Sequence, residues 1–459
     1  MNEHTNKLLN TLMVPELRKM LITKSKNKLS AFCNDLHPAS VAEFLEPLEN
    51  QEQWQLLSML DGDLRSDIFS YFEPERQLQI AEIISDKELT DLLEDMSPDE
   101  RTDLFQSLDE QRQDLLYPSI ARAERLDIKK LSAFEDDMVG SIMTTDYIAI
   151  NQETTVSKAL ETIRRLAPSR ETVYYTYIIN DDRVLVGVVS LKDLILAPGF
   201  DTLKNIMQGS IKYILATSDR EEAGALVKQY DFLALPVVDT EKHIVGIVTV
   251  DDIVDILEEE ATEDFYQLAA VGEQMNYHRD NIFKIAAARI KWLVLLIMVG
   301  YISIWILNQN QDVFKQIIAL TFFIPLLIGA GGNAGAQTTT IVIRSIATGE
   351  LKQSDMWLVL RRELQVGLII GLVLGLLMGG GALLVESSQF DIAINLALTV
   401  GLSVMILVFV AKALGCILPM SLEKAGIDPA LISTPMIACI IDITGILIYI
   451  NIAKIVFGI

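Results

Sequence analysis

Five long apolar segments fill the C-terminal part of this 459-residue chain, and they constrain its fold more than any other feature. They cover approximately residues 290–307, 314–346, 366–385, 392–418 and 430–457. A helix of about 20 apolar residues crosses the roughly 30 Å hydrocarbon core of a bilayer, and a lipid-exposed backbone must satisfy its hydrogen bonds internally. We therefore expect a transmembrane domain of five helices at residues 281–459.

The charge of the chain divides at nearly the same place. From Lys284 onward there are 11 Lys and Arg against 9 Asp and Glu, whereas residues 1–283 hold 27 against 53. The N-terminal part is therefore strongly acidic and should be soluble. Its charge argues against nucleic acid as a partner, because phosphates attract basic surfaces, and favours cations instead.

Basic residues near the apolar segments indicate how the chain crosses the membrane. They gather before the first segment and between the second and third, at Arg279, Lys284, Arg289, Lys291, Arg344, Lys352, Arg361 and Arg362. Because cytoplasmic loops carry the excess of Lys and Arg, this pattern places the N-terminus in the cytoplasm and the C-terminus outside. The first residues lack the apolar core of a signal peptide, which agrees. We expect a multi-pass protein of the plasma membrane, with the lipid bilayer as a partner.

The chain offers little for catalysis. Its three cysteines lie far apart, and its four histidines include no HExxH pair, so a disulfide framework, a CxxC metal site and an intramembrane zinc protease are all disfavoured. No nucleophile–base constellation is apparent. We expect that the protein is not an enzyme.

Residues 1–133 carry a helical rhythm. The first 30 residues predict a leading helix near residues 7–22, interrupted at Pro15. After them, helix-starting residues recur about every 12 positions, near Pro38, Asn50, Gly62, Pro74, Asp86, Pro98 and Asp109. Helices this short are not stable alone and must stack. We expect residues 1–30 to form an N-terminal extension and residues 31–133 an all-α superhelical domain.

A duplicated α/β unit follows the helical repeats. Residues 185–193 and 244–252 each combine a β-branched strand around a glycine with the start of a helix, and an extended segment and a helix precede each of them. The duplication resembles a tandem of CBS domains, a Bateman module, which usually senses ligands rather than catalyses. We place this pair at residues 134–257. An acidic connecting helix is expected at residues 258–280.

Asp442 is the first candidate for a functional residue in the membrane. It lies near the middle of the fifth apolar segment, with no Lys or Arg within a helical turn or two. A carboxylate at the bilayer centre costs about 2.5–3.5 kcal/mol and usually faces a wet cavity, although a protonated aspartate bonded to a neighbouring helix is the alternative. If two chains met at a two-fold axis, their Asp442 carboxylates would need a cation between them. Mg²⁺ is suitable, because it prefers oxygen ligands and retains its waters.

The second apolar segment contains PLLIGAGGNAGAQ at residues 325–337. Pro325 inside a span would free backbone carbonyls, and the glycines would allow a helix or a hydrated ion to approach the backbone. Asn333 and Gln337 are four residues apart and share a helix face. We expect them to line a pore together with the small residues Ala438 and Gly445, although small residues on a span most often serve helix packing.

With both segments in view, the chain resembles the MgtE family of magnesium channels and transporters over nearly its whole length. The resemblance rests on residues 325–337 and on DPALISTPMIACIIDITG at residues 428–445. It implies a multidomain fold with a helical N domain, a CBS pair, a connecting helix and five transmembrane helices. It also implies a homodimer with a pore between protomers, in which Asp442 is the pore aspartate and Asp428 lies at the cytoplasmic end of that helix.

The resemblance further implies a magnesium sensor in the soluble part. The residues that match its ion sites are Asp99, Asp103, Glu221, Asp231, Asp252, Asp255, Glu260, Glu263 and Asp264. Clustered carboxylates repel one another, so divalent cations that bridge them would favour a compact arrangement. The expected function is a Mg²⁺ channel that cytosolic Mg²⁺ closes.

Two other functions stay open on the sequence alone. A carrier that couples Mg²⁺ to Na⁺ or H⁺ would also use Asp442. A membrane-anchored CBS sensor without transport would use the spans only as anchors, but an anchor has no need of polar and glycine-rich centres. CBS pairs often bind adenine nucleotides, so ATP is a second ligand that the sequence leaves undecided. Selectivity over other divalent cations is equally undecided.

Overall fold

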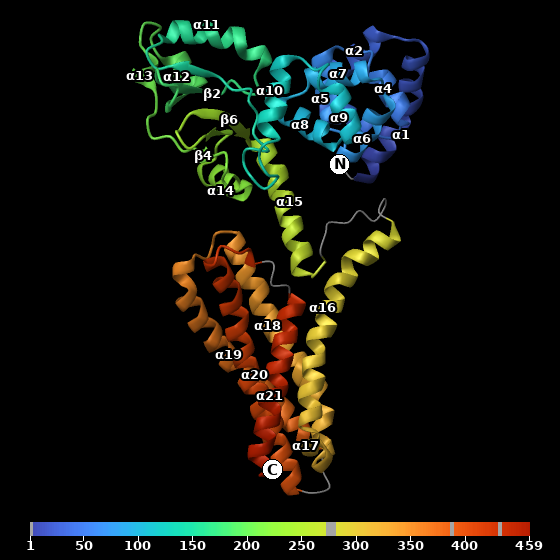
Figure 1. The fold of residues 1–459 in the computed structure, drawn as a ribbon, viewed down its shortest axis with the longest axis vertical. Helices are drawn as coiled ribbons and strands as arrows, with labels where there is room; N and C mark the ends of the chain where they lie inside the picture. The colour runs from blue at the N-terminus through green and yellow to red at the C-terminus, as the bar shows by residue number, and fades with distance from the viewer. Residues whose placement is uncertain (1–2, 272–280, 386–389, 430–433) are drawn as a thin grey trace. The chain divides into compact units, whose positions relative to one another are not determined.

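The computed structural model describes residues 3–271, 281–385, 390–429 and 434–459. The chain divides into two compact units, Met1–Leu257 and Glu258–Ile459 (Figure 1). The first unit contains a helical domain followed by a pair of small α/β domains. The second contains the end of one connecting helix and the long apolar helices.

The helical domain consists of short helices stacked around one apolar core. Within residues 3–131 the helices are α1 (Glu3–Ile22), α2 (Lys26–Asn34), α3 (Pro38–Leu45), α4 (Asn50–Leu57), α5 (Gly62–Ser70), α6 (Pro74–Ile83), α7 (Asp86–Asp95), α8 (Pro98–Ser107), α9 (Glu110–Leu116) and α10 (Arg122–Leu131). The starts of α3 to α9 follow the predicted interval of about 12 residues. Proline lies in the first turn of α3, α6 and α8, where its missing N–H breaks no helical bond.

The leading helix is part of this core. α1 continues through Pro15 without a break. In Figure 1 it lies beside the other helices of this domain. Leu17 of α1 and Leu29 of α2 are fully buried in the same apolar cluster as the later helices. Arg18 Nε lies 2.8 Å from Glu52 Oε1 and ties α1 to α4. The residues expected to form an extension thus complete the first layer of the superhelix.

The α/β pair contains two small sheets of the same design. In the described residues the strands are β1 (Ala149–Asn151), β2 (Tyr175–Ile179), β3 (Leu185–Ser190), β4 (Ile214–Leu215), β5 (Ala234–Val238) and β6 (Ile244–Thr249). The helices are α11 (Val156–Leu166), η1 (Ala167–Ser169), α12 (Leu191–Leu196), α13 (Leu203–Ile206) and α14 (Arg220–Tyr230). The strand orders are β1-β2-β3 and β4-β5-β6, each with one parallel and one antiparallel pair. The duplication read from the sequence is therefore a duplication of structure.

One glycine in each repeat explains the motif that marked the duplication. A Cβ on Gly187 would lie 2.4 Å from Met207 Sδ, and a Cβ on Gly246 would lie 2.6 Å from Met143 Sδ. In both cases the methionine comes from the segment that opens the other repeat, and that segment bridges to the strand beside the glycine, Gln208 to Val188 and Thr144 to Ile247. Only glycine leaves room for it.

The connecting helix α15 (Val250–Leu268) follows β6 directly and continues across the division between the two units. The connector expected at residues 258–280 therefore begins inside an existing helix. Its residues 272–280 lie outside the described residues.

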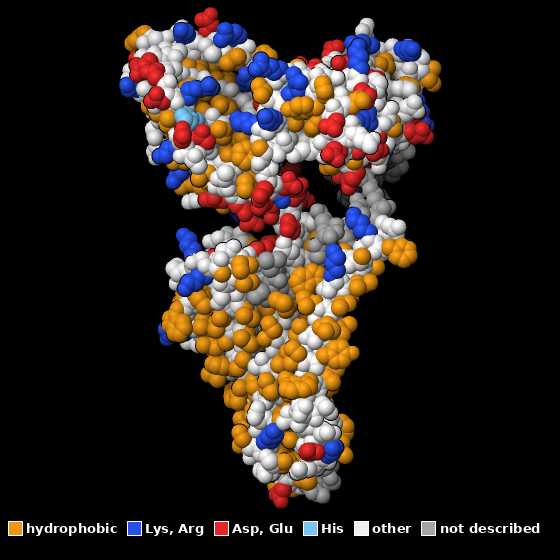
Figure 2. All heavy atoms as spheres, viewed as in Figure 1, with side chains coloured by type: hydrophobic (Ala, Val, Ile, Leu, Met, Phe, Trp, Pro, Cys, Tyr) orange, Lys and Arg blue, Asp and Glu red, His pale blue; other side chains and the backbone are white. Residues whose placement is uncertain are grey.

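The second unit contains, within its described residues, five helices long and apolar enough to cross a membrane, as predicted. The helices after α15 are α16 (Ile282–Gln309), α17 (Gln311–Gln316), η2 (Ile318–Phe323), α18 (Ile324–Ala347), η3 (Gln353–Asp355), α19 (Met356–Val385), α20 (Phe390–Lys424) and α21 (Thr434–Phe457). Hydrophobic side chains cover the outside of this unit in the view of Figure 2. The second span departs from the prediction of one continuous helix. α17 and η2 precede α18, and Pro325 starts α18 rather than interrupting it.

Helices α19 and α20 pack with their backbones in contact. Gly371, Gly375 and Gly379 recur every four residues on one face of α19. A Cβ on Gly375 would lie 2.6 Å from the carbonyl oxygen of Gly401, and one on Gly371 would lie 2.8 Å from that of Met405. Small residues at such positions allow transmembrane helices to approach closely.

Candidate cation sites

Asp442 lies on α21 against the glycine-rich part of α18. A Cβ built on Gly332 would lie 3.7 Å from Asp442 Oδ1 and 3.6 Å from the Cβ of Ala438, one turn earlier on α21. Oδ1 of Asp442 is buried and meets no hydrogen-bond donor among the described residues. A buried carboxylate oxygen without a partner is costly, so this atom is a candidate to bind a proton, a water or a cation.

The glycines of α18 have different roles. A Cβ on Gly331 would lie 2.6 Å from Leu407 Cδ2, and one on Gly335 would lie 2.0 Å from Ile441 Cδ1. These two glycines allow close packing on α20 and α21. Gly332 has only ordinary contacts, so it leaves space beside the carboxylate.

A polar stripe runs along the neighbouring face of α18. Asn333, Gln337 and Thr340 are three or four residues apart and exposed, whereas Thr338 and Thr339 on the opposite face are fully buried. Polar groups within a transmembrane segment avoid lipid and face water or protein. Gly445, which was also expected to line a pore, is buried against other helices of this chain. A Cβ there would lie 2.9 Å from Leu407 and 3.3 Å from Leu327, inside the bundle.

An acidic cluster in the first unit joins the helical domain to the CBS pair. Asp99 and Glu100 lie in the first turn of α8, Asp252 lies in the first turn of α15, and Glu171 precedes β2. Burial, followed by the charges of Asp252, Glu100 and Glu171, raises the pKa of Asp99 well above its usual value. Burial and the neighbouring carboxylates also raise the pKa of Glu171 to about 7, although that residue is exposed overall.

Asp252 has the same elevated proton affinity. Burial raises its pKa to about 6, against the opposing effect of a hydrogen bond that Thr249 Oγ1 donates to Asp252 Oδ2 over 2.5 Å. Asp99 Oδ1 is buried and has no hydrogen-bond partner among the described residues. The cluster therefore favours either a proton or a cation over a set of free carboxylates.

A second acidic cluster lies within the second unit. Glu260, Glu263 and Asp264 on α15 approach Asp428, which follows α20. Burial, followed by the charges of Asp428, Glu260 and Glu263, raises the pKa of Asp264 to about 6. Glu263 Oε1 also accepts a hydrogen bond of 2.9 Å from Gln267 Nε2. Four residues selected from the sequence thus lie together.

The other selected residues lie at the edges of these clusters or apart from them. Asp255 is exposed on α15, and its charge is the smallest contribution to the raised pKa of Tyr71, which burial causes first. Asp103 is exposed on α8. Glu221 lies in the first turn of α14, and Asp231 caps its other end in the left-handed conformation, with φ of 54°.

Neither cluster is a closed metal cage. In the part of the chain that the structure describes, no three His, Cys, Asp or Glu side chains are arranged to hold a metal ion.

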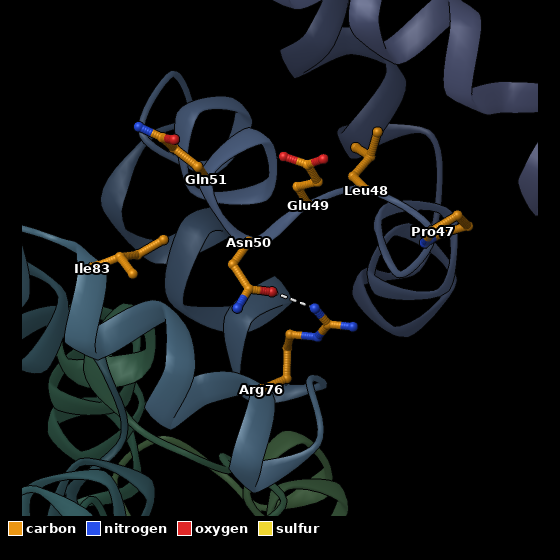
Figure 3. Close-up of a pocket in the computed structure, with 7 residues that line it drawn as sticks. All are labelled: Pro47, Leu48, Glu49, Asn50, Gln51, Arg76 and Ile83. Carbon is orange, nitrogen blue, oxygen red and sulfur yellow. Dashed lines mark hydrogen bonds between the residues drawn. The ribbon is translucent and has the colours of Figure 1, made fainter. Parts of the chain in front are cut away.

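A separate hollow of about 820 Å³ in the helical domain is lined by Pro47, Leu48, Glu49, Asn50, Gln51, Arg76 and Ile83 (Figure 3). Arg76 donates to Asn50 Oδ1 there, and Glu49 is the single acid of the lining, so this hollow is not suited to a cation.

Comparison with known proteins finds similarity to one family over nearly the whole chain. Residues 36–137 match the profile of the MgtE intracellular N domain, and residues 139–199 and 203–259 match the CBS domain. Residues 324–452 match MgtE itself, described as a divalent cation transporter. The magnesium transporter MgtE of Thermus thermophilus is 35% identical over 446 residues, which cover 95% of this chain and 97% of that protein. The chain belongs to the MgtE family of magnesium transporters.

Other MgtE proteins agree. The magnesium transporter MgtE of Bacillus subtilis is 31% identical over 420 residues, which cover 92% of both chains. A crystal structure of the soluble part of a magnesium transporter superposes with a TM-score of 0.52 at 29% identity, and the match covers 55% of this chain and 99% of that one. The resemblance and the fold class predicted from the sequence are confirmed, and MgtE is a family of membrane transporters rather than enzymes.

Sequence reasoning missed two acids of the first cluster. Glu100 directly follows Asp99 in the first turn of α8, so its helix position was a usable signal. Glu171 lies in the segment before β2, outside any helix or strand, and no local pattern marks it.

Proposed function

We propose that this chain forms a Mg²⁺-selective channel of the plasma membrane, with its pore on a two-fold axis between two copies and its N-terminus in the cytoplasm. One observation carries the proposal. The exposed polar stripe Asn333–Gln337–Thr340 lies on the helix that borders the buried, unpartnered Oδ1 of Asp442. A second copy would cover this stripe and place a second Asp442 across the axis. A stripe that lipid disfavours would then face water.

Mg²⁺ matches the chemistry of such a pore. Two carboxylates that face each other in a low-dielectric region repel strongly, and a divalent cation relieves this repulsion. Mg²⁺ retains several of its waters, and the amides of Asn333 and Gln337 can hydrogen-bond to them. Gly332 and Ala438 leave space for these waters beside Asp442.

Cytosolic Mg²⁺ would close this pore through the acidic clusters. In the first unit, cations near Asp99, Glu171 and Asp252 would stabilise the compact arrangement that burial and repulsion now oppose. In the second unit, a cation between Asp264 and Asp428 would tie α15 to the segment between α20 and α21. α21 carries Asp442, so the occupancy of this cluster would reach the pore directly.

The energy required is modest for several weak sites. A ligand shifts an equilibrium only by its difference in affinity for the two states. A switch from 1:99 to 99:1 needs about 5.5 kcal/mol. Five or so sites at about 1 kcal/mol each would supply it, and Glu221, Asp231, Asp103 and Asp255 would add to the two clusters.

The test is Mg²⁺ uptake into proteoliposomes, with the soluble face held at low Mg²⁺. We expect rapid uptake by the wild type, loss of uptake in Asp442→Asn, and normal uptake in Asp391→Asn, a matched control at an exposed position of α20. Uptake that persists in Asp442→Asn would overturn the pore assignment. Uptake that requires a Na⁺ or H⁺ gradient would indicate a coupled carrier, and no uptake by a folded wild type would indicate a sensor.

A further inference from the structure

A buried ion pair inside the second unit has no part in the proposed pore or sensor. Glu363 of α19 and Lys412 of α20 approach within 3.4 Å between Oε2 and Nζ, with side chains only 19% and 5% exposed. Apolar residues of α18, α19 and α20 lie in the same region, namely Val342, Leu360, Cys416 and Met420. Apolar residues of similar size often stabilise a core as well as a buried ion pair does. Stability alone therefore does not account for the pair.

Glu363 also reaches a third helix. Thr338 of α18, which is fully buried, donates a hydrogen bond from Oγ1 to Glu363 Oε2 over 2.7 Å. This bond is much shorter than the 3.5 Å contact between the same hydroxyl and Ala334 O. α19 packs chiefly along α20, so the bond from Thr338 is a direct link from α19 to α18. A hydrogen bond to a charged acceptor is about twice as strong as a neutral one.

The hydrogen bond from Thr338 holds α18 on the face opposite its polar stripe. Thr338 follows Gln337 in the sequence but lies on the opposite face from Asn333, Gln337 and Thr340. A constraint at Thr338 therefore limits the rotation of α18 about its own axis. That rotation decides whether Gly332 stays against Asp442 and whether the polar stripe keeps its direction.

Lys412 keeps Glu363 in place. The carbon stem of Lys412 packs on Gly367, one turn after Glu363 on α19, at 3.2 and 3.3 Å from a Cβ built there. Glycine at this position lets the lysine lie flat between the two helices. The ammonium then lies 3.4 Å from Glu363 Oε2, the same oxygen that accepts the bond from Thr338.

We propose that Glu363 is a positioning residue for ion conduction, which Lys412 holds and which acts through Thr338 to fix the rotation of α18 beside Asp442. The inference rests on the proposed pore for its effect on transport. Its structural part stands without the pore, because the contact between Gly332 and α21 can be measured directly.

The experiment is a disulfide cross-link between α18 and α21 in the full chain. A Cβ on Gly332 lies 3.6 Å from the Cβ of Ala438, within the range of a disulfide. Gly332→Cys and Ala438→Cys are introduced together in a Cys439→Ala background, and the rate of oxidative cross-linking is measured in proteoliposomes. Thr399→Val is the control, because Thr399 is also buried but its hydroxyl donates to Asn395 O within the same helix, α20.

Two double variants separate positioning from stability. Glu363→Gln with Lys412→Met and Glu363→Met with Lys412→Met both remove the two charges and retain similar volume, but only the glutamine offers Thr338 an acceptor. We expect the glutamine variant to cross-link at nearly the wild-type rate and the methionine variant at least about fivefold more slowly, with equal thermal stability. Thr338→Val should be slow as well. Equal rates in the two double variants would overturn the proposal.

Transport is measured on the same double variants without the introduced cysteines. We expect Mg²⁺ uptake to fall about tenfold in the methionine variant relative to the glutamine variant. Asp442→Asn is included to keep the two proposals distinct. If Asp442→Asn transports normally while the cross-link still depends on the acceptor at position 363, the pore assignment fails and the positioning role of Glu363 stands.

Discussion

The first unit and the apolar helices of the second unit treat their carboxylates in opposite ways. In the first unit, Asp99, Glu171 and Asp252 crowd together, and burial with mutual repulsion raises their pKa values. In the second unit, Glu363 is matched by Lys412 and by a hydroxyl donor. A carboxylate with its own cation is fixed and belongs to the architecture. A carboxylate without one leaves a place where an external cation changes the free energy of the compact state.

Asp442 is the informative exception among the apolar helices of the second unit. It shares that unit with a fully compensated Glu363, yet its Oδ1 has no partner among the described residues. The membrane half therefore contains both solutions within neighbouring helices. The contrast predicts that substitutions at carboxylates without a cation partner alter ion movement and regulation. Substitutions where helices pack closely, as α19 and α20 do at their glycines, should alter stability instead.

The largest effect should come from covering Asp442. In Gly332→Leu, atoms beyond the Cβ would project over Asp442 Oδ1, which lies 3.7 Å from that Cβ. We expect Mg²⁺ uptake to fall about 100-fold, equivalent to about 2.7 kcal/mol, with the protein still folded. Gly300→Leu on α16 is the control, because a Cβ there has nothing within 4 Å. Normal uptake by Gly332→Leu would place the ion path elsewhere.

Neutralising the first acidic cluster should have the next largest effect. The combination Asp99→Asn, Glu171→Gln and Asp252→Asn removes both repulsion and cation ligands. We expect closure to require about tenfold more internal Mg²⁺, a loss of about 1.4 kcal/mol of coupling. The thermal midpoint in EDTA should rise at the same time. Neutralising the exposed acids Glu43, Glu82 and Asp182 makes the same change in net charge and should leave both unchanged.

The seam between α19 and α20 should respond in stability alone. Gly375→Ala places a methyl group 2.6 Å from the carbonyl oxygen of Gly401, and neither backbone can yield easily. We expect a loss of about 1–3 kcal/mol in the free energy of unfolding, measured by denaturation in mixed micelles. Gly380→Ala has nothing within 4 Å of its Cβ and should be neutral. Equal stabilities would show that the helices separate without cost.

The smallest effect is a pH dependence of the first unit. Because the pKa values of Glu171 and Asp252 are about 7 and 6 in the folded chain and lower when it unfolds, the folded form binds more protons between about pH 4 and 7. Stability is therefore retained at low pH and lost as pH rises through 6 to 7. In EDTA we expect the thermal midpoint to be a few degrees higher at pH 6 than at pH 8. Saturating Mg²⁺ should reduce this difference, and a midpoint that rises with pH would contradict the repulsion.

Much of the fold follows from local signals. The short helices of the first unit begin at prolines and capping residues, and the five spans follow from the length of their apolar runs. The CBS repeats are visible because Gly187 and Gly246 must both leave room for a methionine. The break before α18 was not predicted, because residues 317–328 are almost all apolar and hydropathy does not distinguish a short 3₁₀ turn from a helix.

The functional residues also divide into those that local sequence reveals and those that only tertiary packing reveals. Asp442 could be selected from the sequence because placing a carboxylate in the middle of one apolar span already costs free energy. Glu363 could not, since its partner Lys412 lies on another helix 49 residues away and only the packing of three helices brings them together. Gly445 was expected to line a pore because the small residues of a packing face and of a pore face look alike in sequence, and in the structure it packs against Leu407 and Leu327.

The glycine seam has a mechanical consequence. Helices whose backbones touch at Gly371, Gly375 and Gly401 cannot slide or roll without backbone collisions, so α19 and α20 move as one rigid plate. Any change in the width of the ion path must then be a displacement of α18 and α21 relative to that plate. The contact between Thr338 and Glu363 joins α18 to the pair of α19 and α20, so it would be the pivot of such a displacement.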